Sequence, residues 1–416
     1  MQTIQKLAAQ TLDTVLSGRN LTDTLAALWR QEPALTGPQR AAIMDICYGS
    51  LRHYGWLRGA LDSLLSKPLA DPFIDRLLII SLYQLLYSQT AAYAVVDHAV
   101  HVATAHDDGR LKALVNAILR NFQRRRAELT ATLKRESVAF WNHPDWWIGV
   151  VQQTWPRDWK QILTVANQHP PMTLRVNVRR TTPEAYLATL TAADMPATLH
   201  TSGAITLTKP VPVDKLPGFA EGVVSVQDAG AQLAASWLEV KDGMRVLDAC
   251  AAPGGKTGHL LEIADLDLTA VDVDTARLAR VSSNLARLGL SAQTVTGDAA
   301  RPATWWDGKP FDRVLADVPC SASGVVRRHP DIKWTRRPTD AQTFARQQIG
   351  FLDALWALVV PGGKMLYATC SIFPAENRRQ IDNFLTRHVN ASLERDIQLL
   401  PSEEHDGFYY ALLCKA

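Results

Sequence analysis

The chain has 416 residues, of which 47% are hydrophobic and 20% are charged. It is too long for a single hydrophobic core, and its composition excludes a disordered or fibrous protein. The net charge is +3, and the basic excess lies near the N-terminus. Residues 1–126 hold 14 Lys and Arg and 10 Asp and Glu, whereas residues 127–416 hold 30 Lys and Arg and 31 Asp and Glu. An anionic partner is therefore expected to dock near the N-terminus.

Residues 5–126 carry a helical pattern throughout. Apolar side chains recur three or four positions apart, and pairs of Gly, Pro and Asp separate the segments. The longest apolar run, residues 77–87, is interrupted by Ser81 and Gln84 and is too short to span a bilayer. We predict an all-α domain over residues 1–140 and no contact with a membrane.

Residues 141–235 have a different pattern. Residues 141–170 are rich in Trp and Pro and predict a helical connector. Residues 172–178 alternate like a strand, a short helix is expected over residues 183–190, and a second strand over residues 204–208. We therefore predict a connector followed by a small α+β module.

Residues 245–257 predict a strand, a loop of small residues and the start of a helix, as at the first turn of a doubly wound sheet. A ligand can approach such a loop closely, and the N–H groups of the helix start face it. The phosphate-binding motif G-x-x-x-x-G-K-[ST] fails because Cys250 occupies the first glycine position, and the spacing G-x-G-x-x-G is also missing. We predict S-adenosylmethionine, which carries no phosphate; a turn without a ligand is the alternative.

Three acidic residues end later strands of this domain. Asp272 comes 18 positions after Gly254, close to the spacing at which an acid holds ribose hydroxyls, and Asp298 and Asp317 end the next two strands. Ligands bind at the carboxyl ends of strands in open α/β sheets, so the three acids predict a crevice. The predicted cofactor contacts are these acids and the loop residues Cys250, Ala251, Ala252, Pro253, Gly254, Gly255 and Lys256.

The five cysteines lie far apart and form no C-x-x-C pair, which argues against a disulfide framework or a zinc site and favours the reducing cytoplasm. Cys320 and Cys370 each follow a strand, at the edge where loops carry function. We interpret Cys47 and Cys414 as small buried hydrophobic residues. The same interpretation is the alternative to a chemical role for Cys320 and Cys370.

Two thiols and an acid suit methyl transfer to carbon-5 of cytosine. Carbon-5 is a poor nucleophile until a thiolate adds at carbon-6, and an acid near ring nitrogen-3 favours this addition. A base must then remove the carbon-5 proton before the thiol can leave. Asp317 is the candidate acid, which requires that it be protonated or share a proton with the base.

Three motifs occur in order: Cys250-Ala-Ala-Pro-Gly-Gly-Lys256, Asp317-Val-Pro-Cys-Ser321 and Tyr367-Ala-Thr-Cys-Ser371. They resemble the signature motifs of the Nol1/Nop2/Sun family of RNA (cytosine-C5) methyltransferases, in which the Thr-Cys cysteine is the nucleophile and the Pro-Cys cysteine helps product release. The resemblance implies that Cys370 is the nucleophile and that Cys320 assists release. Val318 stands where the family usually has alanine, and we expect a minor effect.

The resemblance extends over essentially the whole chain. The sequences Y-G-S-L-R at residues 48–52 and L-V-N-A-I-L-R at residues 114–120 resemble the NusB-type RNA-binding domain. It implies a multi-domain protein: an all-α NusB-like RNA-binding domain, residues 141–235 with a small α+β (RRM-like) RNA-binding module, and a Rossmann-like class I methyltransferase domain over residues 236–416. It also implies a cytoplasmic, metal-free monomer that methylates a cytosine of 16S rRNA.

A basic stretch follows Cys320 in the sequence, and its candidate RNA contacts are Arg327, Arg328, Lys333 and Trp334. Cations interleaved with an aromatic ring suit phosphate contacts and base stacking. A solvated charged loop is the competing explanation. Two other functions stay open: a non-catalytic RNA-binding factor led by the helical domain, and a C5 methyltransferase acting on tRNA or DNA, because DNA enzymes of this chemistry use a Pro-Cys nucleophile.

Overall fold

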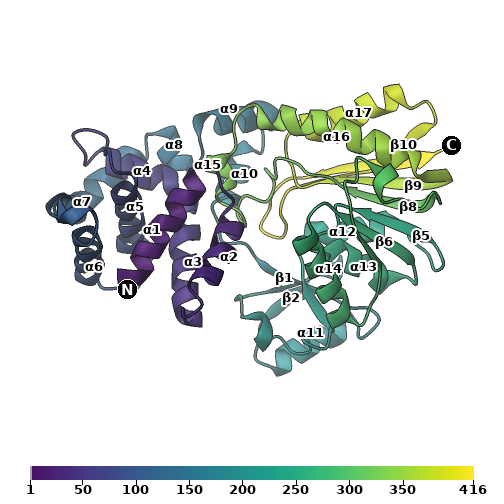
Figure 1. Ribbon diagram of the computed structural model, residues 1–416, viewed down its shortest axis with the longest axis horizontal. Coiled ribbons are helices and arrows are strands. Elements are labelled where there is room, and N and C mark those ends of the chain that lie inside the picture. The colour runs from purple at the N-terminus through teal and green to yellow at the C-terminus, as the bar shows by residue number, and fades with distance from the viewer. Residues whose placement is uncertain (1) are drawn as a thin grey trace. The chain divides into compact units, whose positions relative to one another are not determined.

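The computed structural model describes residues 2–416, which form two compact units (Figure 1). The helical unit comprises Met1–Gln168 and Val326–Pro338, and the α/β unit comprises His169–Val325 and Thr339–Ala416. The helical unit therefore extends beyond the boundary that we predict at residue 140. It also includes the basic stretch, which the sequence places within the methyltransferase domain.

The helical unit begins with helices whose starts are capped by polar side chains. The Asn20 side chain accepts a hydrogen bond from the Asp23 N–H, Thr36 forms a capping box with Gln39, and Asp71 accepts from the Ile74 N–H. The helices are α1 (Gln2–Leu16), α2 (Leu21–Gln31), α3 (Gly37–Arg52), α4 (Tyr54–Asp62), α5 (Pro72–Tyr87), α6 (Ala92–Thr104), α7 (Lys112–Leu133), α8 (Ser137–Trp141), α9 (Asp145–Thr154), α10 (Trp159–Val165) and the later α15 (Ile332–Thr335), with a 3₁₀ turn η1 (Asp107–Gly109).

The core of this unit is built around α5, whose residues from Ile74 to Gln84 are nearly all buried. This helix contains the apolar run of residues 77–87. The buried amide of Gln84 on α5 is paired, because Gln5 Nε2 on α1 donates to Gln84 Oε1 at 2.8 Å. Within residues 2–416, none of the helices has the length and apolar character needed to cross a membrane.

The small module opens the α/β unit and consists of β1 (Met172–Val176), α11 (Pro183–Ala192), β2 (Ala197–Leu199), β3 (Ile205–Leu207), η2 (Val213–Lys215) and β4 (Val224–Val226). Its antiparallel sheet has the order β2-β3-β1-β4. Tyr186 and Leu190 on α11 pack on the sheet with Leu174 and Ile205. Strand β1, helix α11 and strand β3 match the strand, helix and second strand that we predict over residues 172–178, 183–190 and 204–208.

The larger sheet has the order β10-β11-β9-β8-β5-β6-β7. The strands β9, β8, β5, β6 and β7 are parallel to one another. Strand β11 runs antiparallel to both of its neighbours, β9 and β10. Its strands, helices and 3₁₀ turns are α12 (Ala229–Trp237), β5 (Arg245–Ala249), α13 (Gly255–Ile263), β6 (Asp267–Asp272), α14 (Thr275–Leu288), β7 (Gln293–Thr296), η3 (Pro302–Thr304), β8 (Phe311–Asp317), α16 (Asp340–Ala357), β9 (Val359–Thr369), η4 (Pro374–Glu376), α17 (Arg378–Arg387), β10 (Ala391–Leu399) and β11 (Phe408–Lys415).

Helices cover both faces of this sheet (Figure 1). Leu247 on β5 packs with α16 and α17 on one face, whereas its neighbour Val246 packs with α13 and α14 on the other. The predicted multi-domain fold, with all-α, small α+β and Rossmann-like α/β parts, is confirmed. In the parallel register Ala249 lies opposite both Val271 and Ala316, so the loops that follow β5, β6 and β8 emerge at one edge.

Candidate active site

The 250–256 loop leaves β5 and leads into α13. Its backbone needs left-handed conformations, with φ of 64° at Cys250 and 95° at Gly254. A Cβ atom at Gly254 would lie 3.0 Å from the Cα of Val281 on α14, so a side chain is excluded there by both φ and space. The Ala251 N–H donates to the Val271 carbonyl at 2.9 Å, which ties the loop to β6.

Two of the predicted acids shape the loops at this edge. Asp272 is buried at 3% exposure, where Oδ2 accepts from the Ala252 N–H at 3.1 Å and Oδ1 from the Asp274 N–H at 3.0 Å. Asp298 is more exposed and accepts from the Ala300 N–H at 2.9 Å. A carboxylate has about four acceptor sites, so each acid retains capacity for a ligand hydroxyl.

Asp248 is a further acid beneath the loop. Burial raises its pKa to about 7, and the charges of Asp317 and Asp272 raise it by smaller amounts. The Thr257 hydroxyl, which donates to Oδ2 at 2.5 Å, lowers the pKa. Its other oxygen, Oδ1, is buried and has no hydrogen-bond partner among residues 2–416. An unpaired buried oxygen is costly, and burial favours the protonated form of this acid.

Lys256 joins the loop to the end of β8. Its Nζ lies 2.6 Å from Asp317 Oδ2. Burial alone would lower the pKa of Lys256, but the charge and hydrogen bond of Asp317, with smaller contributions from Cys370 and Asp248, raise it above its usual value. The lysine is therefore a cation, and it forms an ion pair with the Asp317 side chain.

Cys320 and Cys370 lie together after β8 and β9, with 3.4 Å between the two Sγ atoms. The hydrogen bond to Cys370 raises the pKa of the Cys320 thiol well above its usual value, and burial raises it further. Either sulfur can donate in this contact, and Cys320 holds its proton more firmly than an ordinary thiol does. Both thiols are free.

A buried carboxylate connects the two cysteine loops. Glu376 Oε1 accepts from the Ser321 N–H at 2.6 Å, and Oε2 accepts from the hydroxyls of Ser321 at 2.5 Å and Ser371 at 2.6 Å. Burial raises the pKa of Glu376, although these hydrogen bonds lower it. Because Ser321 follows Cys320 and Ser371 follows Cys370, one side chain fixes the backbone beside both thiols.

The groups around the 250–256 loop fit S-adenosylmethionine. Asp248, Asp272 and Asp317 are close enough that their charges act on one another. Such a site favours a ligand that carries a sulfonium, an ammonium and ribose hydroxyls, and it disfavours the phosphates of a dinucleotide. Among residues 2–416, no group of three or more His, Cys, Asp or Glu is placed to hold a metal ion.

Comparison with known proteins identifies the family. Residues 235–414 match the model described as 16S rRNA methyltransferase RsmB/F, residues 143–214 its ferredoxin-like domain, and residues 2–124 the NusB family. The chain is 42% identical over 424 residues to ribosomal RNA small subunit methyltransferase B of Vibrio vulnificus, covering 99% of each chain. The corresponding Vibrio cholerae protein is 43% identical over 425 residues, covering 99% of this chain and 97% of the relative.

The chain belongs to the 16S rRNA methyltransferase RsmB/F family. This confirms the resemblance to the Sun-type methyltransferases and the prediction of an S-adenosylmethionine-dependent enzyme family. Among solved structures, PH0851 shares the fold with a TM-score of 0.80 at 22% identity, covering 98% of each chain. NSun6 from Pyrococcus horikoshii has a TM-score of 0.59 at 19% identity, covering 65% of this chain and 98% of its own.

The basic stretch does not form the surface that we predict. Lys333 has 0% exposure, and its Nζ donates to the Arg52 carbonyl at 3.0 Å and to Asn167 Oδ1 at 2.8 Å, while burial lowers its pKa well below the usual value. Arg327 is 2% exposed, and Trp334 Nε1 donates to the Leu51 carbonyl at 2.7 Å.

The predicted RNA contacts of Lys333 and Arg327 are therefore not available in this structure, because both side chains lie in the interior of the RsmB/F helical unit. Trp334 is partly buried, so its RNA contact stays a prediction. Arg328 is only partly buried, so its RNA contact stays a prediction.

Sequence reasoning missed three features of this RsmB/F site. Asp248 was visible only as an acid within an apolar strand, and Glu376 carried no signal because its partners lie up to 55 residues away. The third feature is the ion pair between Lys256 Nζ and Asp317 Oδ2. The role of Asp317 as an acid near ring nitrogen-3 stays a prediction.

Proposed function

We propose that this protein transfers a methyl group from S-adenosylmethionine to carbon-5 of a cytosine in 16S rRNA through a covalent adduct with Cys370. The observation that carries the proposal is the 3.4 Å contact between the Cys320 and Cys370 sulfurs. The thiols lie at the strand edge that also holds the 250–256 loop, because Lys256 bonds Asp317 at the end of β8 and its charge interacts with Cys370. The Vibrio relatives are named rRNA small subunit methyltransferases, which supports 16S rRNA as the substrate.

The surroundings of Cys320 support a division of roles between the two cysteines. The pKa of Cys320 is raised well above its usual value, first by the hydrogen bond to Cys370 and then by burial, so Cys320 is poorly suited to attack as a thiolate. This leaves Cys370 as the sulfur proposed to attack carbon-6, since the thiolate is the nucleophile. The target base has to leave its stack to reach the pair.

The two thiols take different parts in the bond changes at the cytosine. Cys370 sulfur bonds to carbon-6, and carbon-5 takes the methyl group that S-adenosylmethionine supplies. A base next removes the carbon-5 proton, and its electron pair restores the ring double bond as the Cys370–carbon-6 bond breaks. Once Cys370 has reacted, it no longer shares a hydrogen bond with Cys320. Cys320 then passes its own proton to water and accepts the carbon-5 proton as a thiolate, directly or through a water molecule, while Cys370 leaves carbon-6 as a thiolate.

The cofactor is held, in this proposal, by the backbone of the 250–256 loop with Asp272, Asp298 and Asp317. Asp272 both braces the loop through Ala252 and retains capacity for a ribose hydroxyl. Lys256 neutralises Asp317 and keeps its carboxylate beside the loop. The NusB-like helical unit and the small module are proposed to bind RNA. The free thiols suit the reducing cytoplasm.

Transfer of a labelled methyl group to total RNA, followed by mapping of 5-methylcytosine, tests the proposal. We expect label in 16S rRNA at a single cytosine. Label in tRNA or DNA would support the alternative C5 methyltransferases, and RNA binding without cofactor binding would support a non-catalytic factor. Either result would overturn the proposed function.

A further inference from the structure

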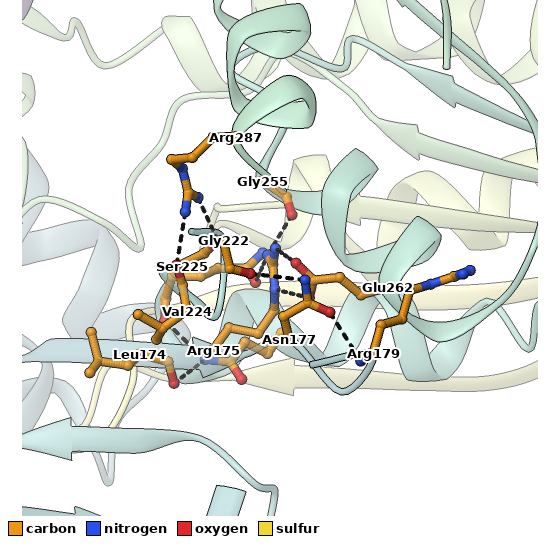
Figure 2. Close-up of polar contacts among 12 residues, drawn as sticks. Leu174, Arg175, Asn177, Arg179, Gly222, Val224, Ser225, Gly255, Glu262 and Arg287 are labelled. Carbon is orange, nitrogen blue, oxygen red and sulfur yellow. Dashed lines mark hydrogen bonds and ion pairs between the residues drawn. The ribbon is translucent and has the colours of Figure 1, made fainter. Parts of the chain in front are cut away.

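A buried arginine of the small module reaches toward the 250–256 loop (Figure 2). Arg175 lies on β1, and its Nε and Nη2 donate to the two carboxylate oxygens of Glu262 on α13, at 2.8 and 2.7 Å. The two side chains are only 3% and 1% exposed. Because displacing either partner would leave a buried charge unpaired, this bidentate pair fixes the direction of the guanidinium.

The remaining terminal nitrogen of Arg175 holds the loop itself. Nη1 donates to the Gly255 carbonyl at 2.6 Å and to Gln227 Oε1 at 2.7 Å. Gly255 is the first residue of α13 and directly follows Gly254, whose left-handed backbone turns the loop into the helix. The end of the loop is thus tied by a charge-assisted hydrogen bond to a cation that stands in a different sheet.

A second arginine crosses between the same two parts of the α/β unit. Arg287 on α14 donates from Nη1 to the Phe219 carbonyl at 2.7 Å and to the Val224 carbonyl at 3.0 Å, and from Nη2 to Ser225 Oγ at 2.9 Å. In Figure 2 the Arg287 side chain extends to Ser225 and Val224, while Arg175 extends to Gly255 and Glu262. Both arginines attach the small module, and of the two it is Arg175 that holds the loop.

We propose that Arg175 is a positioning residue for the cofactor site, through which the small module sets the affinity for S-adenosylmethionine in addition to its role toward RNA. The inference rests on the proposed use of this cofactor. A loop that is already held in its bound shape loses less freedom when the ligand binds, so an untethered loop binds more weakly. Because Gly255 belongs to the cofactor loop and not to the cysteine pair, the loss should appear in the Kd and KM for the cofactor rather than in kcat.

Arg175→Lys tests this inference, with Arg287→Lys as the matched control. Lysine keeps a positive charge beside Glu262, but one ammonium cannot reproduce the planar fork that holds both Glu262 and Gly255. Calorimetry gives the Kd for S-adenosylmethionine, thermal unfolding gives the Tm, and assays at saturating 16S rRNA give kcat and the KM for the cofactor.

We expect both substitutions to lower the Tm. Arg175→Lys alone should raise the Kd and KM for the cofactor by about tenfold, the value of one hydrogen bond from a charged donor, with kcat close to that of the wild type. Gln227→Leu is a second variant that removes an acceptor of Arg175 Nη1 and leaves the ion pair intact. It should weaken cofactor binding in the same direction by a smaller factor.

Equal cofactor affinity in the wild type and in folded Arg175→Lys would overturn the inference, as would an equal loss in Arg287→Lys. If Arg175→Lys does not fold, wild-type affinity in Gln227→Leu has the same meaning. A wild-type protein that binds no S-adenosylmethionine would instead refute the proposed function, so the two failures are distinguishable.

Discussion

Asp248→Asn should change how the stability of the α/β unit depends on pH. Burial raises the pKa of Asp248 from 3.8 to about 7, so between these values the folded protein keeps a proton that the unfolded chain releases. Stability therefore falls as the pH rises through this range. Each pKa unit is worth about 1.4 kcal/mol, so the shift of about three units lowers the free energy of unfolding by about 4 kcal/mol.

Asparagine has nearly the same shape as aspartic acid, keeps a carbonyl oxygen for the Thr257 hydroxyl and does not titrate. The free energy of unfolding of the variant minus that of the wild type should rise by about 4 kcal/mol between about pH 4 and about pH 8. Urea unfolding followed by tryptophan fluorescence at a series of pH values measures this difference. The other titrating groups are shared and cancel. Parallel pH profiles of the two proteins would refute the reasoning from burial.

Three further predictions concern the cofactor, the RNA and the cysteine loops. Asp272→Ala removes the acceptor of the Ala252 N–H and should weaken S-adenosylmethionine binding in calorimetry by about tenfold; unchanged affinity would contradict its role. The double substitution Arg124→Glu and Arg126→Glu, at two exposed positions of α7, should weaken 16S rRNA binding and reduce its salt dependence in filter-binding assays. Unchanged RNA affinity would mean that this part of the helical unit does not contact RNA. Glu376→Ala removes three hydrogen bonds from buried donors and should lower the free energy of urea unfolding by about 3 kcal/mol, whereas a loss close to zero would mean that contacts among the serine hydroxyls replace them.

Much of the site could be predicted because it depends on local sequence. Asp272 and Asp317 end apolar strands, and Cys320 and Cys370 follow strands directly. Parallel strands present their carboxyl ends at one edge, so the order of strands and acids was sufficient to predict that these side chains share one edge of the sheet. The small residues of the 250–256 loop likewise carry their own conformational signal, as the positive φ at Gly254 shows.

The remaining features depend on partners far away in the sequence. Arg175 and Glu262 are 87 positions apart, and Lys333 is held by Arg52 at the end of α3 and by Asn167 in the turn after α10. Lys and Arg are rarely buried, so a basic stretch predicts solvent or RNA contact unless its buried acceptors are known. Glu376 could not be assigned for the same reason, because its carboxylate acquires a role only when the two serine loops meet.

In the proposed mechanism Cys370 attacks the cytosine and Cys320 releases the product. Denaturing gel electrophoresis of Cys370→Ser and Cys320→Ser, each incubated with 16S rRNA and S-adenosylmethionine, distinguishes these two roles. Cys320→Ser should still attack and accept the methyl group but fail to release, so a slow protein–RNA band should accumulate. Cys370→Ser should form no such band and show almost no turnover. A slow band from Cys370→Ser, with none from Cys320→Ser, would contradict the claim and reverse the two roles.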